Sequence, residues 1–484
     1  MIRKALIASL SLCVLLSVAA AQEATSQPAT GDDLQSLKEK IKDQDKRIEQ
    51  LEAATGKNEE AFRQIQREEI LKILKDMKVE ADKHSDLRVF WRDGIRAETA
   101  DGDTKLHMGI REQVDWTWFR EDGFNDHKPN GVTEKSSTVK DGAELRRSYF
   151  TMDGQIYKNI DFCFQYDFVG LTTPSGSTTQ FGTPKPIDDF IRLKNIPVVG
   201  DIEAGHFNEP FEMEQLTSDA NQVFMERSLA NALAPARNLG FQAHNAFLPD
   251  STKTNRMTYA TGMFRDTDDY GFQQADGGYN WTSRVTGLPL YEDKGQELIH
   301  LGLAYSYRNP QSQGQFRARP EDAMAPYLID TGKFNVDKVN LFGGEVAGVY
   351  KAFHAEGELT SAATQGFEQG NENYCFNGFY AEAGYFITGE SKPYNPTYGI
   401  WDRVKPNKNF RENGGLGAWE VAARYSYLNL EDKNINGGRM EDVTVGLNWY
   451  LNPNVKVMWD YVHSGEDNWS TSSDAFLMRF QIDF

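Results

Sequence analysis

Apolar and polar side chains alternate along most of the chain after about Asp86, in segments of roughly ten residues. Clusters of Gly, Asn, Asp and Pro separate the segments. A period of two is that of a β-strand, in which successive side chains point to opposite faces. The end of the chain shows it best, with an apolar face and a mostly polar face: Phe476, Met478, Phe480, Ile482 and Phe484 against Leu477, Arg479, Gln481 and Asp483.

Three features favour a membrane barrel over a soluble β-sandwich, which alternation alone would fit equally well. The chain begins with a secretory signal, short turns contrast with long polar loops, and the last strand ends on Phe484. An aromatic residue at that place is similar to the assembly signal of outer-membrane barrels. The expected fold class is all-β, a transmembrane antiparallel β-barrel of about 16 strands (about 16–18) between Leu106 and Phe484.

Several barrel strands can be placed individually. The clearest alternation falls in residues 299–307, 379–387, 419–427, 443–451 and 455–461. Trp and Tyr near the ends of these strands suit the two interfacial girdles of a barrel. Asn452-Pro453-Asn454 predicts a tight turn between the last two of them, and Arg88 to Glu98 is a candidate for an additional hairpin arm.

The part of the chain before the barrel has a different pattern. Residues 1–21 read as a signal peptide, with basic Arg3 and Lys4 before an apolar run and small residues at its end, and 22–31 read as a linker. Residues 32–80 form a helical coiled-coil segment by prediction, from the spacing of Leu34, Leu37, Ile41, Ile48 and Leu51. A lone charged helix is the alternative. We expect a self-associating periplasmic stalk, followed by the barrel in residues 87–484.

Composition narrows the functional classes. The net charge of −19 argues against nucleic-acid binding, and no apolar run after the signal is long enough for a transmembrane helix. Only Cys163 and Cys375 remain outside the signal, too few for a disulfide framework. The eight histidines are scattered and no serine lies in a nucleophile elbow. We therefore expect no catalytic residues, no metal site and no cofactor, and the protein is not expected to be an enzyme.

Four motifs resemble one known family. They are GHFNEPFEMEQLTSDANQVFMERSLANALAPARNLGFQ (residues 205–242), LRRSYFTMDG, GYFITGESKPYN and AWEVAARYSYLNL. These motifs resemble the phosphate-selective porin O and P family, and with the terminal strands the resemblance spreads over residues 87–484. Members are homotrimeric outer-membrane barrels whose long third external loop folds into the pore, and some select anions such as phosphate.

The resemblance implies an inward loop from Asn208 to Arg237. Its constriction residues would be Asn208, Glu209, Phe211, Glu212 and Glu214. Asn208 stands where the family pattern leads us to expect a lysine, so the motif does not establish phosphate selectivity at the narrowest point. The glutamates could oppose Arg227 and Arg237 across the constriction, as opposed charges do in general porins.

Strand parity predicts which side chains face the lumen. Around residue 150 the apolar Phe150 and Met152 mark the lipid face, which places Arg147 and Tyr149 in the lumen and Arg146 near an interface or at a bulge. Guanidinium groups fit phosphate and carboxylate oxygens, so a series of them could conduct anions. The candidate anion path is Arg111, Arg147, Tyr149, Arg227, Arg237, Arg284, Arg424 and Arg479. Alternatively, these arginines pair with lumen acids and only stiffen the wall: Asp115, Asp153, Asp161, Asp167 and Glu420.

The favoured function is therefore passive transport of small anions, phosphate or polyphosphate above all, through a water-filled outer-membrane porin. The expected partners are further copies of the chain in a homotrimer, outer-membrane lipid and small anions such as phosphate. The expected location is the cell outer membrane, with the N-terminal segment in the periplasm. The alternatives are a general diffusion porin with little selectivity and a structural anchor between outer membrane and cell wall.

Overall fold

The computed structural model describes residues 42–43, 46 and 87–484 with gaps at 121–124, 128–132, 136–139, 170–173, 176–177, 180–183, 269, 275, 311, 367–371 and 467–470. The chain divides into two compact units, Met1–Ser85 and Asp86–Phe484. Of the first unit only Lys42, Asp43 and Lys46 are described, and all three are helical. The signal peptide, the linker and nearly all of the coiled-coil segment lie outside the described residues and remain predictions.

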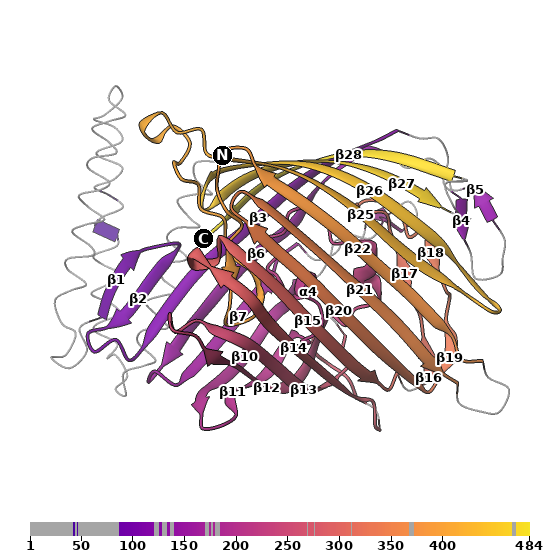
Figure 1. Cartoon of the computed structure of the whole chain (residues 1–484), viewed down its shortest axis with the longest axis horizontal. Helices are drawn as coiled ribbons and strands as arrows, with labels where there is room; N and C mark the ends of the chain where they lie inside the picture. Colours follow the sequence, from indigo (N-terminus) through magenta and orange to yellow (C-terminus); the bar gives the residue numbers. More distant parts are fainter. Residues whose placement is uncertain are drawn as a thin grey trace. The chain divides into compact units, whose positions relative to one another are not determined.

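The second unit is a barrel. Sixteen of the described strands pair in chain order, each antiparallel to its neighbours, and the last strand pairs with the first (Figure 1). These strands are β3 (Lys105–Arg120), β6 (Gly142–Ile156), β7 (Ile160–Asp167), β10 (Lys185–Ile196), β11 (Gly200–Asn208), β12 (Arg237–Pro249), β13 (Asn255–Arg265), β14 (Tyr279–Glu292), β15 (Glu297–Arg308), β20 (Lys338–Tyr350), β21 (Phe353–Gln365), β22 (Cys375–Phe386), β25 (Ala418–Asp432), β26 (Ile435–Asn452), β27 (Val455–Glu466) and β28 (Thr471–Asp483). The predicted closed antiparallel barrel is confirmed.

Shorter elements lie in the connections. The small strands are β1 (Leu87–Trp91), β2 (Ile95–Thr99), β4 (Asn125–His127), β5 (Thr133–Lys135), β8 (Pro174–Ser175), β9 (Thr178–Thr179), β16 (Ser312–Gly314), β17 (Arg317–Ala318), β18 (Ile329–Asp330), β19 (Phe334–Val336), β23 (Tyr394–Asn395) and β24 (Ile400–Trp401). The helical turns are α4 (Met213–Leu216), η1 (Leu229–Leu233), η2 (Asp293–Gly295) and η3 (Glu412–Gly414). The predicted hairpin arm is present as the antiparallel pair β1–β2.

Alternation in the sequence becomes a two-faced wall. On β28 the side chains of Phe476 and Phe480 are 42% and 47% exposed, whereas those of Leu477 and Arg479 are almost fully buried. Exposed large apolar residues occur on the outer face of each described barrel strand except β11, as a lipid-facing band requires. Inner-face side chains are largely buried, because connecting segments fill much of the lumen.

The two ends of the barrel differ in their connections. At the short-turn end the strands are joined by tight turns, among them the predicted one around Pro453. At the opposite, long-loop end lie the connections 209–236 and 309–337. Two connections depart from this asymmetry: β25 and β26 are joined by a tight turn at the long-loop end, and residues 387–417 form a long segment at the short-turn end. It carries β23 and β24, and its Trp401 backbone amide donates to Thr217 inside the barrel (3.3 Å).

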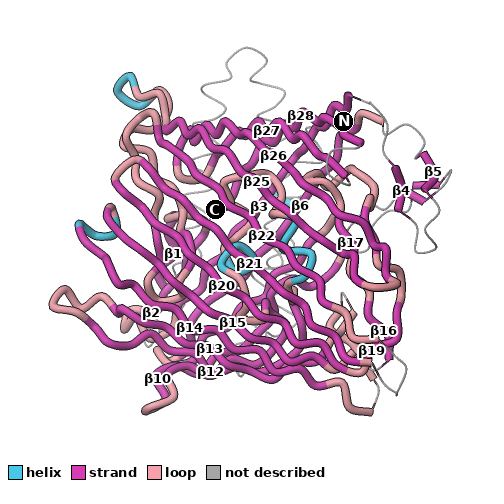
Figure 2. The backbone as a smooth tube through the Cα atoms, turned by 45° about the vertical axis from the view of Figure 1, so that its right-hand side comes forward, coloured by secondary structure: helices cyan, strands magenta, loops and turns pink. Residues whose placement is uncertain are grey.

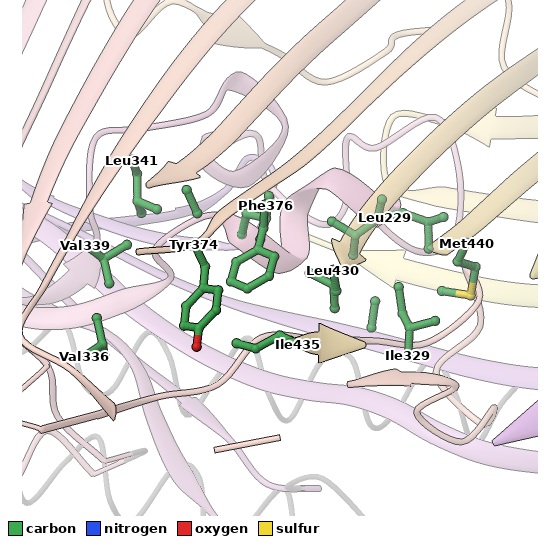
Figure 3. Packing of buried hydrophobic residues seen from close by; sticks show 14 of the residues in the cluster. Leu229, Ile329, Val336, Val339, Leu341, Tyr374, Phe376, Leu430, Ile435 and Met440 are labelled. Atoms are coloured by element: carbon green, nitrogen blue, oxygen red, sulfur yellow. The ribbon is translucent and has the colours of Figure 1, made fainter. Parts of the chain in front are cut away.

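Segments from both ends enter the lumen. Figure 2 shows helical turns within the ring of strands, and η1 contacts β21, β22 and β25. Around η1 a buried apolar cluster joins the connection 309–337 to the inner wall from β20 to β26 (Figure 3). Its members include Leu229, Ile329, Val336, Leu341, Tyr374, Phe376, Leu430 and Met440. This side of the lumen is packed with hydrocarbon, so a water-filled path needs the polar side.

Candidate functional site

The connection 209–236, which we call the inner loop, is attached to the wall through its backbone. The Asp460 carboxylate accepts a hydrogen bond from the Met225 backbone amide (2.8 Å). Three wall side chains donate to backbone carbonyls of the loop: Asn448 to Val223 (2.7 Å), Lys456 to Gln222 (2.9 Å) and Gln481 to Ala220 (3.1 Å). These wall residues are buried inner-face positions of β26, β27 and β28. These bonds hold the loop at a fixed place in the lumen. Another part of the loop, at Asp219, faces β3 and β6.

Arginines from three elements meet at that edge around one carboxylate. Asp219 of the inner loop lies 2.8 Å from Arg227 Nη2, 3.2 Å from Arg147 Nε and 3.9 Å from Arg111 Nη1. The Arg111 guanidinium also lies 5.4 Å from the ring centre of Tyr149. Strand parity brings Arg111, Arg147 and Tyr149 to the inner face, and the inner loop supplies Asp219 and Arg227. These five side chains form one polar cluster, which we call the arginine cluster.

A pocket of about 250 Å³ opens beside this cluster. Its walls carry five basic side chains against three acidic ones: Arg146, Arg147, Lys185, Arg227 and Arg237 against Asp167, Asp219 and Asp268. Arg237 holds Asp188 through two hydrogen bonds (2.8 and 3.1 Å). The volume equals that of roughly eight liquid waters, which is enough for a small hydrated anion. The excess of guanidinium groups gives the pocket a positive bias.

Arg146 reaches the same region because the strand is irregular there. The pairing of β6 with β3 shifts register between Arg147 and Leu145, so that Arg146 sits at a bulge, which confirms the expectation for that position. Two successive arginines thereby turn inward. Arg146 binds both carboxylate oxygens of Glu226 on the inner loop at 2.9 Å. Burial acts to raise the pKa of Glu226, but Arg146, Arg147 and Arg479 hold that pKa below its ordinary value.

Three of the eight candidate residues do not line the pocket and are held in buried ion pairs. Arg284 binds Glu345 (2.8 Å) and the Gly399 carbonyl (2.7 Å). Arg424 binds Glu321 (2.9 Å) and Glu214 (3.3 Å). Arg479 binds Asp115 (2.6 Å) and Glu226 (2.9 Å). Each arginine is nearly inaccessible to solvent and ties the wall to a segment in the lumen or to the next strand. This is the alternative role, in which arginines pair with lumen acids and stiffen the wall.

The three constriction glutamates, Glu209, Glu212 and Glu214, do not contact the arginines around Asp219 through their carboxylates; Glu214 instead accepts from Arg424 of β25 (3.3 Å). Glu209 accepts from Asn238 (2.7 Å) and Arg308 (3.1 Å), Glu212 from Thr360 (2.6 Å), and Glu214 from Ser228 (2.8 Å). Asn208 and Gln215 bond to each other (2.9 Å), while Phe211 joins the apolar cluster around η1. The acid opposite the arginines is Asp219, which no strand parity could reveal because it lies in an irregular loop.

Other kinds of site are not found in the part of the chain that the structure describes. No group of three or more His, Cys, Asp or Glu side chains there is arranged to hold a metal ion. Cys163 and Cys375 are free thiols. No helix within the described ranges is long and apolar enough to cross a membrane.

A closed barrel with an apolar outer face, an inward loop and a charged pocket is an outer-membrane channel of the porin class. The sequence model of the phosphate-selective porin O and P family matches residues 124–484. The chain belongs to that family, and it is a channel and not an enzyme. The predicted family and the predicted outer-membrane location are thereby confirmed.

Two relatives match the chain at modest identity. Porin O of Pseudomonas aeruginosa is 26% identical over 435 residues, which cover 83% of this chain and 93% of that protein. An uncharacterized protein of Caulobacter vibrioides is 26% identical over 332 residues, 66% of this chain and 62% of its own. Among solved structures, the outer membrane channel DcaP of Acinetobacter baumannii is similar with a TM-score of 0.49 and 9% identity, covering 80% of this chain and 99% of that one.

Proposed function

We propose that the protein conducts small anions passively across the outer membrane, with phosphate or polyphosphate as favoured solutes. The observation that carries the proposal is the convergence of Arg111, Arg147, Arg227 and Arg237 around one polar pocket inside the barrel. A guanidinium group keeps its charge at every physiological pH and offers a planar fork of donors to oxyanions. Membership of a family described as phosphate-selective supports an anion channel of this kind.

A general diffusion porin with little selectivity is the second candidate. Nearby acids favour it, because Asp219 pairs with Arg147, Arg227 and, at 3.9 Å, Arg111, while Asp188 pairs with Arg237. When nearby carboxylates neutralise the fixed guanidinium charges, the net electric field in the channel is small. Such a channel would discriminate weakly between permeating anions and cations.

Ion selectivity of the purified protein in planar bilayers tests the proposal. We expect a reversal potential in a KCl gradient that reports anion preference, and a chloride current that inorganic phosphate blocks. Arg147→Ala should reduce both several-fold, since a charge-assisted hydrogen bond contributes roughly 1.5–3 kcal/mol. Arg256→Ala is the control, because Arg256 binds Asp250 near a turn, outside the arginine cluster. Cation preference of the wild type, or an unchanged Arg147→Ala channel, would contradict an anion path and favour general diffusion.

We further propose that three copies assemble and that residues 32–80 form a periplasmic coiled coil at their shared axis. The heptad spacing from Leu34 to Leu51 supports this arrangement. Deleting residues 32–80 should lower the thermal stability of the trimer, measured by its mass in detergent over a temperature series. An unchanged trimer would show that the segment serves another purpose, such as anchoring to the cell wall.

A further inference from the structure

Asp219 lies where an anion bound by the arginine cluster would place its own oxygens. Its Oδ1 is 2.8 Å from Arg227, and its Oδ2 is 3.2 Å from Arg147 and 3.9 Å from Arg111. The three arginines come from the inner loop, from β6 and from β3, so the carboxylate is the point where separate elements converge. Ser218, the preceding residue, accepts a hydrogen bond from Arg111 Nη2 (2.8 Å) and fixes that guanidinium beside it.

The carboxylate remains ionised in this position. Asp219 is buried, which acts to raise its pKa, but Arg147, Arg227, Arg237 and Arg111 together hold that pKa well below its ordinary value. A permanent negative charge is therefore present among the arginines at neutral pH. Any small oxyanion that enters the adjacent pocket of about 250 Å³ meets this charge at short range.

A carboxylate and a phosphate group compete for the same donors. Both are planar or tetrahedral oxygen acceptors that guanidinium forks bind through paired hydrogen bonds. Arg147 donates from Nη1 to Gln113 (2.8 Å) and faces Asp219 with its Nε, and both Arg147 and Arg227 line the pocket beside that carboxylate. An oxyanion bound in the pocket therefore shares the charges of these two guanidinium groups with Asp219.

We propose that Asp219 is a resident counter-ion that sets the affinity of the arginine cluster for small oxyanions. The inference rests on the proposed anion path and adds the residue that determines how tightly that path binds its solute. Conduction requires a site that an ion can leave, and a competing carboxylate inside the site keeps binding weak. Glu226 has a different place, because Arg146 and Arg479 hold it against the wall.

The experiment uses Asp219→Asn in the full-length protein, because asparagine keeps the size of the side chain and removes its charge. We expect the half-blocking concentration of inorganic phosphate on the chloride current to fall about tenfold, with longer blocked intervals in single-channel records. Asp219→Glu, which keeps the charge, should remain close to wild type. Asp161→Asn serves as the matched control, because Asp161 is also a lumen acid but pairs with Lys194 and Arg192 instead of the cluster.

The outcomes separate this inference from the function on which it rests. If phosphate blocks the wild type and Asp219→Asn leaves the half-blocking concentration unchanged, the resident counter-ion is wrong while the anion path stands. If Asp161→Asn tightens the block equally, the effect is one of overall lumen charge, and the specific role of Asp219 is again wrong. If phosphate blocks neither wild type nor variant, the anion path itself fails. A variant with fewer folded channels but unchanged block would show a structural role alone.

Discussion

Replacing Arg479 by methionine should destabilise the barrel more than any change of a single surface charge. Arg479 is almost fully buried and gives two hydrogen bonds to Asp115 (2.7 and 2.6 Å), one to Glu226 (2.9 Å) and one to the Met225 carbonyl (2.6 Å). Glu226 would retain Arg146, but Asp115 would become a buried carboxylate without its cation. Breaking a buried pair from one side costs roughly 3–5 kcal/mol.

The measurement is the free energy of unfolding in urea for barrels refolded into phospholipid vesicles, followed by tryptophan fluorescence. Arg439→Met is the control, since the Arg439–Glu431 pair is about one-third exposed and should be worth roughly 0–1 kcal/mol. The double variant Asp115→Asn with Arg479→Met should recover part of the loss, because the orphaned charge is removed. A loss below about 1 kcal/mol in the single variant, or a double variant at least as unstable, would refute the reasoning.

Three further changes test other parts of the structure. Gly109→Ala should lower the yield of folded barrel on unheated gels, because an added Cβ would clash with the Phe484 carbonyl oxygen, whereas Gly287→Ala, whose Cβ would have no neighbour within 4 Å, should not. Phe484→Ala removes a ring whose centre lies 5.0 Å from that of Trp91, and should reduce the folded fraction while single-channel current stays unchanged; reduced current at normal yield would contradict this. Burial raises the pKa of Glu212 from 4.5 to about 7, so the folded state binds a proton that the unfolded state releases, and stability should fall as pH rises from about 4.5 to about 7. Glu212 can contribute at most about 1.4 kcal/mol per pH unit to the slope of the unfolding free energy against pH. Urea titrations at pH 5 and pH 8 should show a smaller difference for Glu212→Gln than for the wild type.

Strand parity accounts for most of what the sequence could predict. The alternation of residues 475–484 places Arg479 on the inner face and Phe480 on the outer face, as the structure has them. For Arg146, parity left two places open, near an interface or at a bulge, and the structure has the bulge. The side on which a residue lies is a local property, so a local pattern can specify it.

Partners across the lumen are not local, and the sequence left them open. Parity places Arg424 inside the barrel, but its partner Glu321 comes from the connection 309–337 and its partner Glu214 from the inner loop. Irregular segments have no period from which an orientation can be inferred. For the same reason the long connection 387–417 at the short-turn end and the position of Asp219 among the arginines were visible only in three dimensions.

The closing contact between β28 and β3 has a consequence for how the barrel finds its register. Among the described barrel strands, every other pair joins neighbours along the chain, whereas Arg479 and Asp115 are 364 residues apart. No connecting turn can align these two strands, and a slip of one residue would send every inner side chain to the lipid. Arg479 lies opposite Asp115, and Gln481 opposite Gln113 at 2.7 Å, so a slip of two residues would separate both pairs. These polar pairs on the inner wall therefore specify the register in which β28 pairs with β3.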